Sequence, residues 1–120
     1  MAFRYMKLSD EHYRHVLVRF ADFFEDFRCF VEMSKDLTEE LELTLDRDDS
    51  YTRYLVRLFV ITEEMTGQQI EDPRSDETVN MITEVVNDKN FSRYNSAECG
   101  VPGRMFEAYE TFVGEGLEIS

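Results

Sequence analysis

Aromatic and branched side chains recur at steps of three and four between Ser9 and Asp36, and this pattern constrains the fold more than any other. The apolar stripe consists of Tyr13, Val16, Leu17, Phe20, Phe23, Phe24, Phe27, Phe30 and Val31. Ser9 is a suitable N-cap. We therefore expect one helix from Ser9 to Ser34 or Asp36, roughly 40 Å long. Because so heavy a stripe must be covered, we expect the remaining chain to pack around this helix.

The next segment predicts two helices in succession. Thr38 can cap a helix that begins at Glu39. From Ser50 the apolar residues continue at helical spacing for about fifteen residues. Residues 54–62 are also rich enough in β-branched and aromatic side chains to form a buried strand, but the length of the periodicity favours a helix. Gly67 is expected to end this helix, since glycine is the usual residue at a helix stop.

Two further helices are predicted beyond Gly67, with irregular chain before each of them. Asp76 and Glu77 suit the first turn of a helix, where the helix dipole favours anions. Gly114 is expected to stop the last helix. The predicted elements are a loop at 67–75, a helix at 76–86, irregular chain at 87–103, a helix from Pro102 to Val113 and a frayed tail at 115–120.

The composition agrees with a single helical domain. The chain has 120 residues, of which 42% are hydrophobic and 13% aromatic, with only 5 Gly and 2 Pro. These proportions are typical of a globular protein with few tight turns. We therefore predict an all-α fold, a single compact domain over residues 1–120, with about five helices around the long N-terminal helix. Residues 1–8 are a short lead-in.

Cysteine usage and hydropathy favour a cytoplasmic protein. Cys29 and Cys99 could form one pair at most, which is too few for the disulfide framework of a small secreted protein. The apolar run at the N-terminus is too short for a signal peptide. No segment approaches the roughly 18 apolar residues of a membrane span. We expect a reduced, cytoplasmic protein without membrane contact.

Catalytic and metal-binding motifs are absent from the sequence. His12 and His15 lie three residues apart, which is neither the His-Glu-x-x-His pattern nor the Glu-x-x-His pattern of di-iron bundles. A small metal-dependent enzyme that uses these histidines is therefore a minority hypothesis. Cys99 is distant in sequence from both histidines, so it lacks a nearby base. We expect no catalysis, no metal and no cofactor.

The formal net charge of −13 is the most unusual property of the composition. Such a field repels nucleic acid and anionic membranes and attracts cationic surfaces. Four carboxylates, Glu39, Glu42, Asp46 and Asp49, follow one another at helical spacing. Mutual repulsion along such a stripe opposes the helix by on the order of 1 kcal/mol. Its spacing of roughly 5–6 Å approximates the pitch of phosphates along a nucleic-acid strand.

These features favour a non-catalytic inhibitor or regulator that occludes a basic, nucleic-acid-binding site on a partner protein. The candidate partner-binding residues are Glu39, Glu42, Asp46, Asp49, Glu63, Glu64, Glu71, Asp72, Asp76 and Glu77. In being small, strongly acidic, helical and without catalytic residues, the chain is similar in kind to the DNA-mimic inhibitors that phages make against restriction or CRISPR systems. The resemblance implies competitive binding to a basic groove.

Two alternatives remain open. The acidity could serve solubility alone. The chain could also be a helical adaptor or homo-oligomer, such as a homodimer, whose contact surface is formed by surplus aromatic residues. The aromatic residues of that alternative are Tyr51, Phe59, Phe91 and Tyr94.

Overall fold

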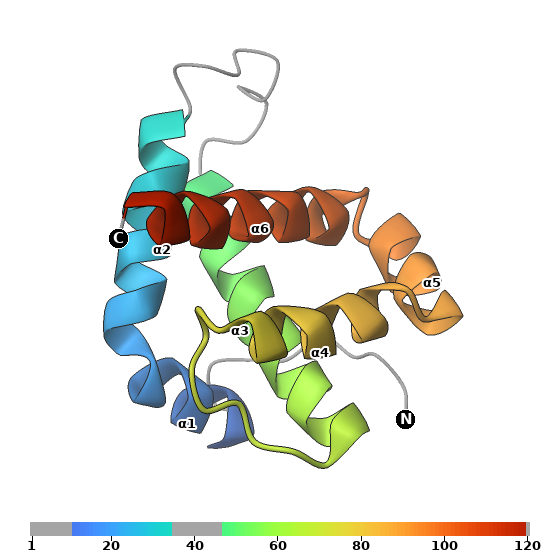
Figure 1. Ribbon diagram of the computed structural model, residues 1–120. Helices are drawn as coiled ribbons and strands as arrows, with labels where there is room; N and C mark the ends of the chain where they lie inside the picture. The colour runs from blue at the N-terminus through green and yellow to red at the C-terminus, as the bar shows by residue number, and fades with distance from the viewer. Residues whose placement is uncertain (1–10, 35–46, 120) are drawn as a thin grey trace.

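A computed structural model describes the backbone of residues 11–34 and 47–119, and the side chains of 11–31 and 51–114. Within these ranges the chain forms helices and no strands, and the helices pack into one compact body (Figure 1). The prediction of a single all-α domain is confirmed. The helices are α1 Glu11–Arg19, α2 Ala21–Ser34, α3 Arg47–Thr66, α4 Asp76–Val86, α5 Lys89–Ala97 and α6 Val101–Ile119.

Helix α3 lies at the centre of the fold. It contacts α1, α2, α4 and α6, and it runs through the middle of the molecule between them (Figure 1). Its consecutive residues from Leu55 to Val60 are all buried, so the helix is covered on every side. A helical segment without a solvent-facing side is mostly apolar around its whole circumference, and the one charged residue of this run, Arg57, lies over the Tyr54 ring. This is why residues 54–62 resemble a buried strand in sequence, and the prediction that they form a helix is confirmed.

The expected single helix over residues 9–36 is wrong, because the chain turns at Phe20 between α1 and α2. Buried side chains of both helices face α3, including Val16 of α1 and Phe24 of α2. The ring of Phe20 itself lies 6.0 Å from that of Phe59. A straight helix would cross α3 at one point only, whereas the bend lets both halves pack along it. The N-terminal helices are thus one layer around α3 and do not form the centre.

Aromatic side chains from α2, α3 and α6 fill the space between these helices. The ring centroids of Phe24 and Phe59 are 5.3 Å apart, and those of Phe23 and Phe112 are 5.6 Å apart. Tyr109 completes the cluster, with its centroid 5.9 Å from that of Phe59. These tilted and edge-to-face arrangements are the favoured geometries of aromatic pairs. The predicted aromatic stripe therefore serves as core.

Two of the predicted helix boundaries are confirmed, and their caps explain them. Helix α3 ends at Thr66, and Gly67 adopts a φ of 70°, a conformation that costs glycine nothing. Helix α4 begins at Asp76 because the Ser75 side chain accepts a hydrogen bond from the Thr78 amide. Between them, residues 67–75 form the expected loop.

Two other predictions in the C-terminal half are wrong. Residues 87–103 were expected to be irregular, but they contain α5, which is capped by the Asp88 side chain and anchored by buried Phe91. Helix α6 was expected to stop at Gly114, but it continues to Ile119. Gly114 does not have a positive φ, so it weakens the helix locally without ending it.

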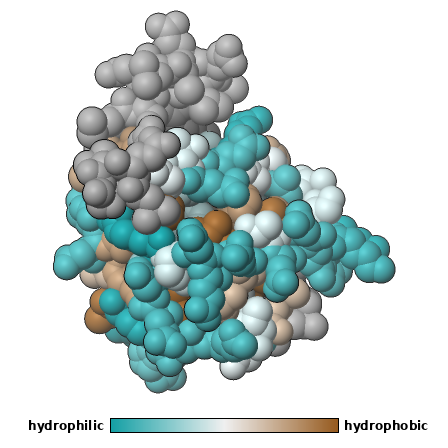
Figure 2. All heavy atoms as spheres, viewed as in Figure 1, coloured by the Kyte–Doolittle hydropathy of each residue, from teal (hydrophilic) through white to brown (hydrophobic). Residues whose placement is uncertain are grey.

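The predicted second helix, from Glu39 to Asp49, lies almost wholly outside the described residues. Its last positions, 47–49, form the first turn of α3. No helix in the described part of the chain is both long enough and apolar enough to cross a membrane. Figure 2 shows hydrophilic side chains over most of one face, with hydrophobic atoms visible in small areas between them.

Candidate functional site

The acidic stripe predicted from the sequence cannot be placed in this structure. Glu39, Glu42 and Asp46 lie outside the described residues. The backbone of Asp49 belongs to α3, but its side chain is not among those described. The role of these four carboxylates in binding a partner therefore remains a prediction.

Glu63 does not lie on the exposed surface, which corrects its place among the candidate carboxylates. Its side chain is 7% exposed and forms ion pairs with His12 and Arg19. The Oε2 atom also accepts a 2.8 Å hydrogen bond from the Ile70 amide. A buried carboxylate needs partners of this kind, because the loss of hydration would otherwise be very costly. Glu63 joins α1, α3 and the loop that follows α3.

The imidazole of His12 lies between two carboxylates of α3. Its Nε2 atom is 2.9 Å from Oε1 of Glu63, and its Nδ1 atom is 3.1 Å from Oε2 of Glu64. Both contacts are ion pairs when the ring is protonated. Burial lowers the pKa of His12, but the hydrogen bonds and negative charges of Glu63 and Glu64 outweigh it, so the net pKa lies above the ordinary 6.5. Glu64, with 20% of its side chain exposed, is thus also engaged within the protein.

The two histidines do not converge on one site. The His15 side chain is 69% exposed and lies 3.9 Å from Glu11, one turn earlier on the same helix. Among the described residues, no group of three or more His, Cys, Asp or Glu side chains is arranged to hold a metal ion. Cys29 and Cys99 are both free and exposed. The hypothesis of a metal-dependent enzyme therefore gains no support from the geometry.

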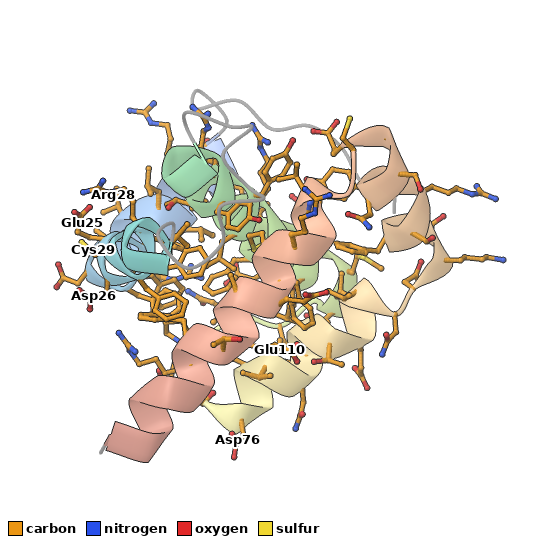
Figure 3. All side chains as sticks on the ribbon, turned by 90° about the horizontal axis from the view of Figure 1, so that it is seen from above. Glu25, Asp26, Arg28, Cys29, Asp76 and Glu110 are labelled. Atoms are coloured by element: carbon orange, nitrogen blue, oxygen red, sulfur yellow. The ribbon has the colours of Figure 1, made fainter. Side chains whose placement is uncertain are left out.

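The remaining four candidates, Glu71, Asp72, Asp76 and Glu77, lie close together where the loop 67–75 meets α4. Three of them, Glu71, Asp72 and Glu77, border an open hollow of about 670 Å³. Asp76, the first residue of α4, is exposed and points away from the helices (Figure 3). The cavity and these four carboxylates together are called the acidic hollow below. Its lining residues are Gln68, Gln69, Glu71, Asp72, Ser75, Glu77, Thr78 and Met81.

Hydrogen bonds within the loop fix the backbone of the acidic hollow. The Thr78 hydroxyl donates a 2.6 Å hydrogen bond to the carbonyl oxygen of Asp72, and the Ser75 hydroxyl donates a 3.0 Å bond to the same oxygen. The Asp72 side chain in turn accepts a 3.0 Å hydrogen bond from the Arg74 amide. Turns of this kind are typical of Asp and Ser beside a helix start. The sequence Asp72 to Thr78 therefore holds its own shape.

Two contacts with other elements anchor the same loop. The Tyr109 hydroxyl of α6 donates a 2.7 Å hydrogen bond to the carbonyl oxygen of Pro73. At the other end, Ile70 is 1% exposed, and its amide donates to Glu63 as described above. The loop is thus attached to both α3 and α6, which positions its acidic side chains on a supported backbone.

No cation of the described part of the chain forms an ion pair with the four carboxylates of the acidic hollow. Arg74 is adjacent in sequence, but its guanidinium lies 3.3 Å from Asp26 of α2 and 4.9 Å from the ring centroid of Phe112. The positive end of the α4 dipole favours Asp76 and Glu77 in the first turn, but it leaves their formal charges in place. The hollow therefore presents four negative charges to solvent.

The aromatic residues of the adaptor alternative do not form an exposed surface. Tyr51, Phe59 and Phe91 are 6%, 0% and 3% exposed, and Tyr94 is half-buried. They lie in or against the core because α3 is covered on all sides and α5 packs over α4 and α6. Within the described side chains, Val18 is the one large hydrophobic residue that is exposed, at 76%.

Sequence reasoning missed the contact of His12 with Glu63 and Glu64. These residues are 51 and 52 positions apart, and no local pattern indicates that they meet. The only signal in the sequence is that Glu63 and Glu64 closely follow the apolar residues 58–61 of the same predicted helix.

Comparison with known proteins gave no relative of this chain. It matched no protein-family model, no curated protein and no solved structure. The function is therefore inferred from the contacts, burial and charge of the chain itself.

Proposed function

We propose that this chain is an acidic, non-catalytic protein that binds a basic site on a nucleic-acid-handling protein and occludes it. The observation that carries the proposal is the acidic hollow, where Glu71, Asp72, Asp76 and Glu77 form no ion pair with a cation in the described part of the chain. In kind, such an inhibitor is similar to phage DNA mimics directed against restriction or CRISPR systems.

Two physical arguments support the proposal. A concentrated negative surface accelerates encounter with a basic groove and disfavours acidic partners. The supported backbone of the hollow also reduces the loop ordering that binding would otherwise require. The predicted stripe of Glu39, Glu42, Asp46 and Asp49 adds to the negative charge of the chain. Binding should then weaken with salt, since screening acts directly on exposed charges.

The decisive experiment begins with capture of the partner on the immobilised chain, followed by elution with salt. The captured protein is identified, and its binding to a labelled nucleic acid is measured by fluorescence anisotropy with and without the chain. We expect the chain to displace the nucleic acid, and to do so less well at 300 mM than at 50 mM salt. Displacement that is absent, or unchanged between the two salt concentrations, would contradict the proposal.

A pair of variants with equal charge tests the position of the site. The first variant neutralises the acidic hollow, as Glu71→Gln, Asp72→Asn, Asp76→Asn and Glu77→Gln. We expect its affinity for the partner to fall by about tenfold or more at low salt, on the scale of several exposed ion pairs. The amide side chains keep the hydrogen-bond acceptors of the loop, so the fold should be retained.

The matched control removes four carboxylates from other places, as Asp22→Asn, Glu25→Gln, Glu84→Gln and Glu107→Gln. Figure 3 shows that Glu25 lies on the outer side of α2, away from Asp76. If both variants bind equally weakly, net charge alone is responsible, and the acidic hollow is not the binding site.

A further inference from the structure

We propose that His12 is a pH-sensitive latch, which in its protonated form ties α1 to the end of α3 and thereby holds the loop that carries the acidic hollow. The latch consists of His12, Arg19, Glu63 and Glu64, together with the Ile70 amide. The latch would regulate the proposed function, because it holds the loop that carries the acidic hollow. The latch itself can exist without a partner, but any effect of the latch on partner binding rests on the proposed function.

The positions of the two carboxylates require a protonated ring. A neutral imidazole has one N–H group and one lone pair, so it can donate to only one of two acceptors. Here Nε2 lies 2.9 Å from Glu63 and Nδ1 lies 3.1 Å from Glu64, and a carboxylate at ordinary pH is an acceptor only. The imidazolium donates to both. Loss of the proton would place a lone pair against a carboxylate and break one of the two contacts.

Glu63 transmits this change to the loop. One of its oxygens faces His12, and the other accepts the Ile70 amide and pairs with Arg19. Ile70 is buried and directly precedes Glu71 and Asp72 of the acidic hollow. When His12 is neutral, Glu63 keeps Arg19 but loses a charged donor, so its position beneath the loop is less firmly fixed.

The charges around His12 favour the latched form. The groups that face it within the described part of the chain include Glu63 and Glu64 of α3, with Arg19 of α1 on the far side of Glu63. The loop contributes the uncharged Ile70 amide. Protonation of His12 adds a positive charge next to the two carboxylates. Consistently, the pKa of His12 lies above its ordinary value. The latch is therefore closed at acidic pH and loosens as the pH rises.

Amide hydrogen exchange of Ile70 and NMR titration of His12 test the latch in the full chain. We expect the Ile70 protection factor, corrected for the intrinsic rate, to fall by about twofold from pH 6 to pH 8.5, the scale of one ion pair in a partly exposed site. The midpoint of this fall should coincide with the His12 titration. In His12→Gln the dependence on pH should vanish, whereas in the control His15→Gln it should remain.

Three results would overturn the latch: an Ile70 protection factor that does not change with pH, the same change in His12→Gln, or a His12 titration at or below pH 6.5. The first and third are read from the wild-type chain, so they do not depend on the folding of a variant. A nonaarginine peptide separates the two proposals. If the latch titrates as expected but the peptide does not bind at any pH, the proposed function fails and the latch stands. If the peptide binds while Ile70 is unaffected, the latch fails alone.

Discussion

The hydroxyl of Tyr109 on α6 donates a 2.7 Å hydrogen bond to the carbonyl oxygen of Pro73, in the loop that carries the acidic hollow. Tyr109 is fully buried and Pro73 is buried, so neither group can turn to water instead. Burial and the negative charges of Asp72 and Glu110 raise the pKa of the Tyr109 hydroxyl well above its ordinary value. The hydroxyl therefore remains a donor across the range in which proteins are usually studied.

Replacing this donor should destabilise the protein. We expect Tyr109→Phe to lower the free energy of unfolding by about 1–2 kcal/mol, because it leaves a buried carbonyl oxygen without its partner. Urea denaturation followed by circular dichroism measures this change. Thr111→Ala, at an exposed position of the same helix, is the control and should change the free energy by less than about 0.5 kcal/mol. Equal effects of the two substitutions would show that the hydrogen bond to Pro73 contributes nothing.

Removing the carboxylate of Glu63 should be more severe than removing an exposed one. We expect Glu63→Ala to lower the free energy of unfolding by about 2–3 kcal/mol, since it leaves Arg19 and the Ile70 amide without their acceptor. Glu77→Ala, in the acidic hollow, should change it by about 0.5 kcal/mol or less. Thermal and urea denaturation of both variants provide the comparison. A harmless Glu63→Ala would mean that this ion-pair cluster does not hold α1 to α3.

The contribution of His12 to stability should depend on pH. Its folded-state pKa lies above the ordinary 6.5, so its favourable contribution is complete below that value and is lost as the pH rises through the folded-state pKa. We expect wild type to exceed His12→Gln in stability by about 0.5 kcal/mol at pH 5.5, the scale of a partly exposed ion pair, and by less at pH 9. Urea denaturation at both pH values measures the difference. If the difference in stability between wild type and His12→Gln instead increased with pH, protonation of His12 would not stabilise the fold.

Gly114 inside α6 and Gly67 directly after α3 should respond in opposite directions to replacement by alanine. Gly114 lies inside α6 without a positive φ, and an added Cβ would meet no atom within 4 Å. We expect Gly114→Ala to stabilise the protein by about 0.5–1 kcal/mol. Gly67 has a φ of 70°, so Gly67→Ala should destabilise it by about 1 kcal/mol. Thermal denaturation compares the two. If Gly114→Ala is destabilising instead, α6 does not continue through this position.

The sequence by itself determined the features that depend on neighbouring residues. Helical spacing established the all-α class, and the acidic first turn at Asp76 and the Gly67 stop placed one end of α4 and one end of α3 correctly. It also identified the four carboxylates of the acidic hollow as candidates. Such signals are readable because caps, turns and side-chain periodicity are set by residues within a few positions of each other.

Tertiary structure decided the rest, because each remaining feature depends on contacts between distant segments. The bend at Phe20 follows from packing two helices along α3, and α5 is fixed in place by Phe91 although its composition is rich in Asn and Ser. Glu63 reads in sequence like any other carboxylate of this acidic chain. Only the approach of α1 to the end of α3 buries it, pairs it with His12, and separates it from the exposed carboxylates that it resembles.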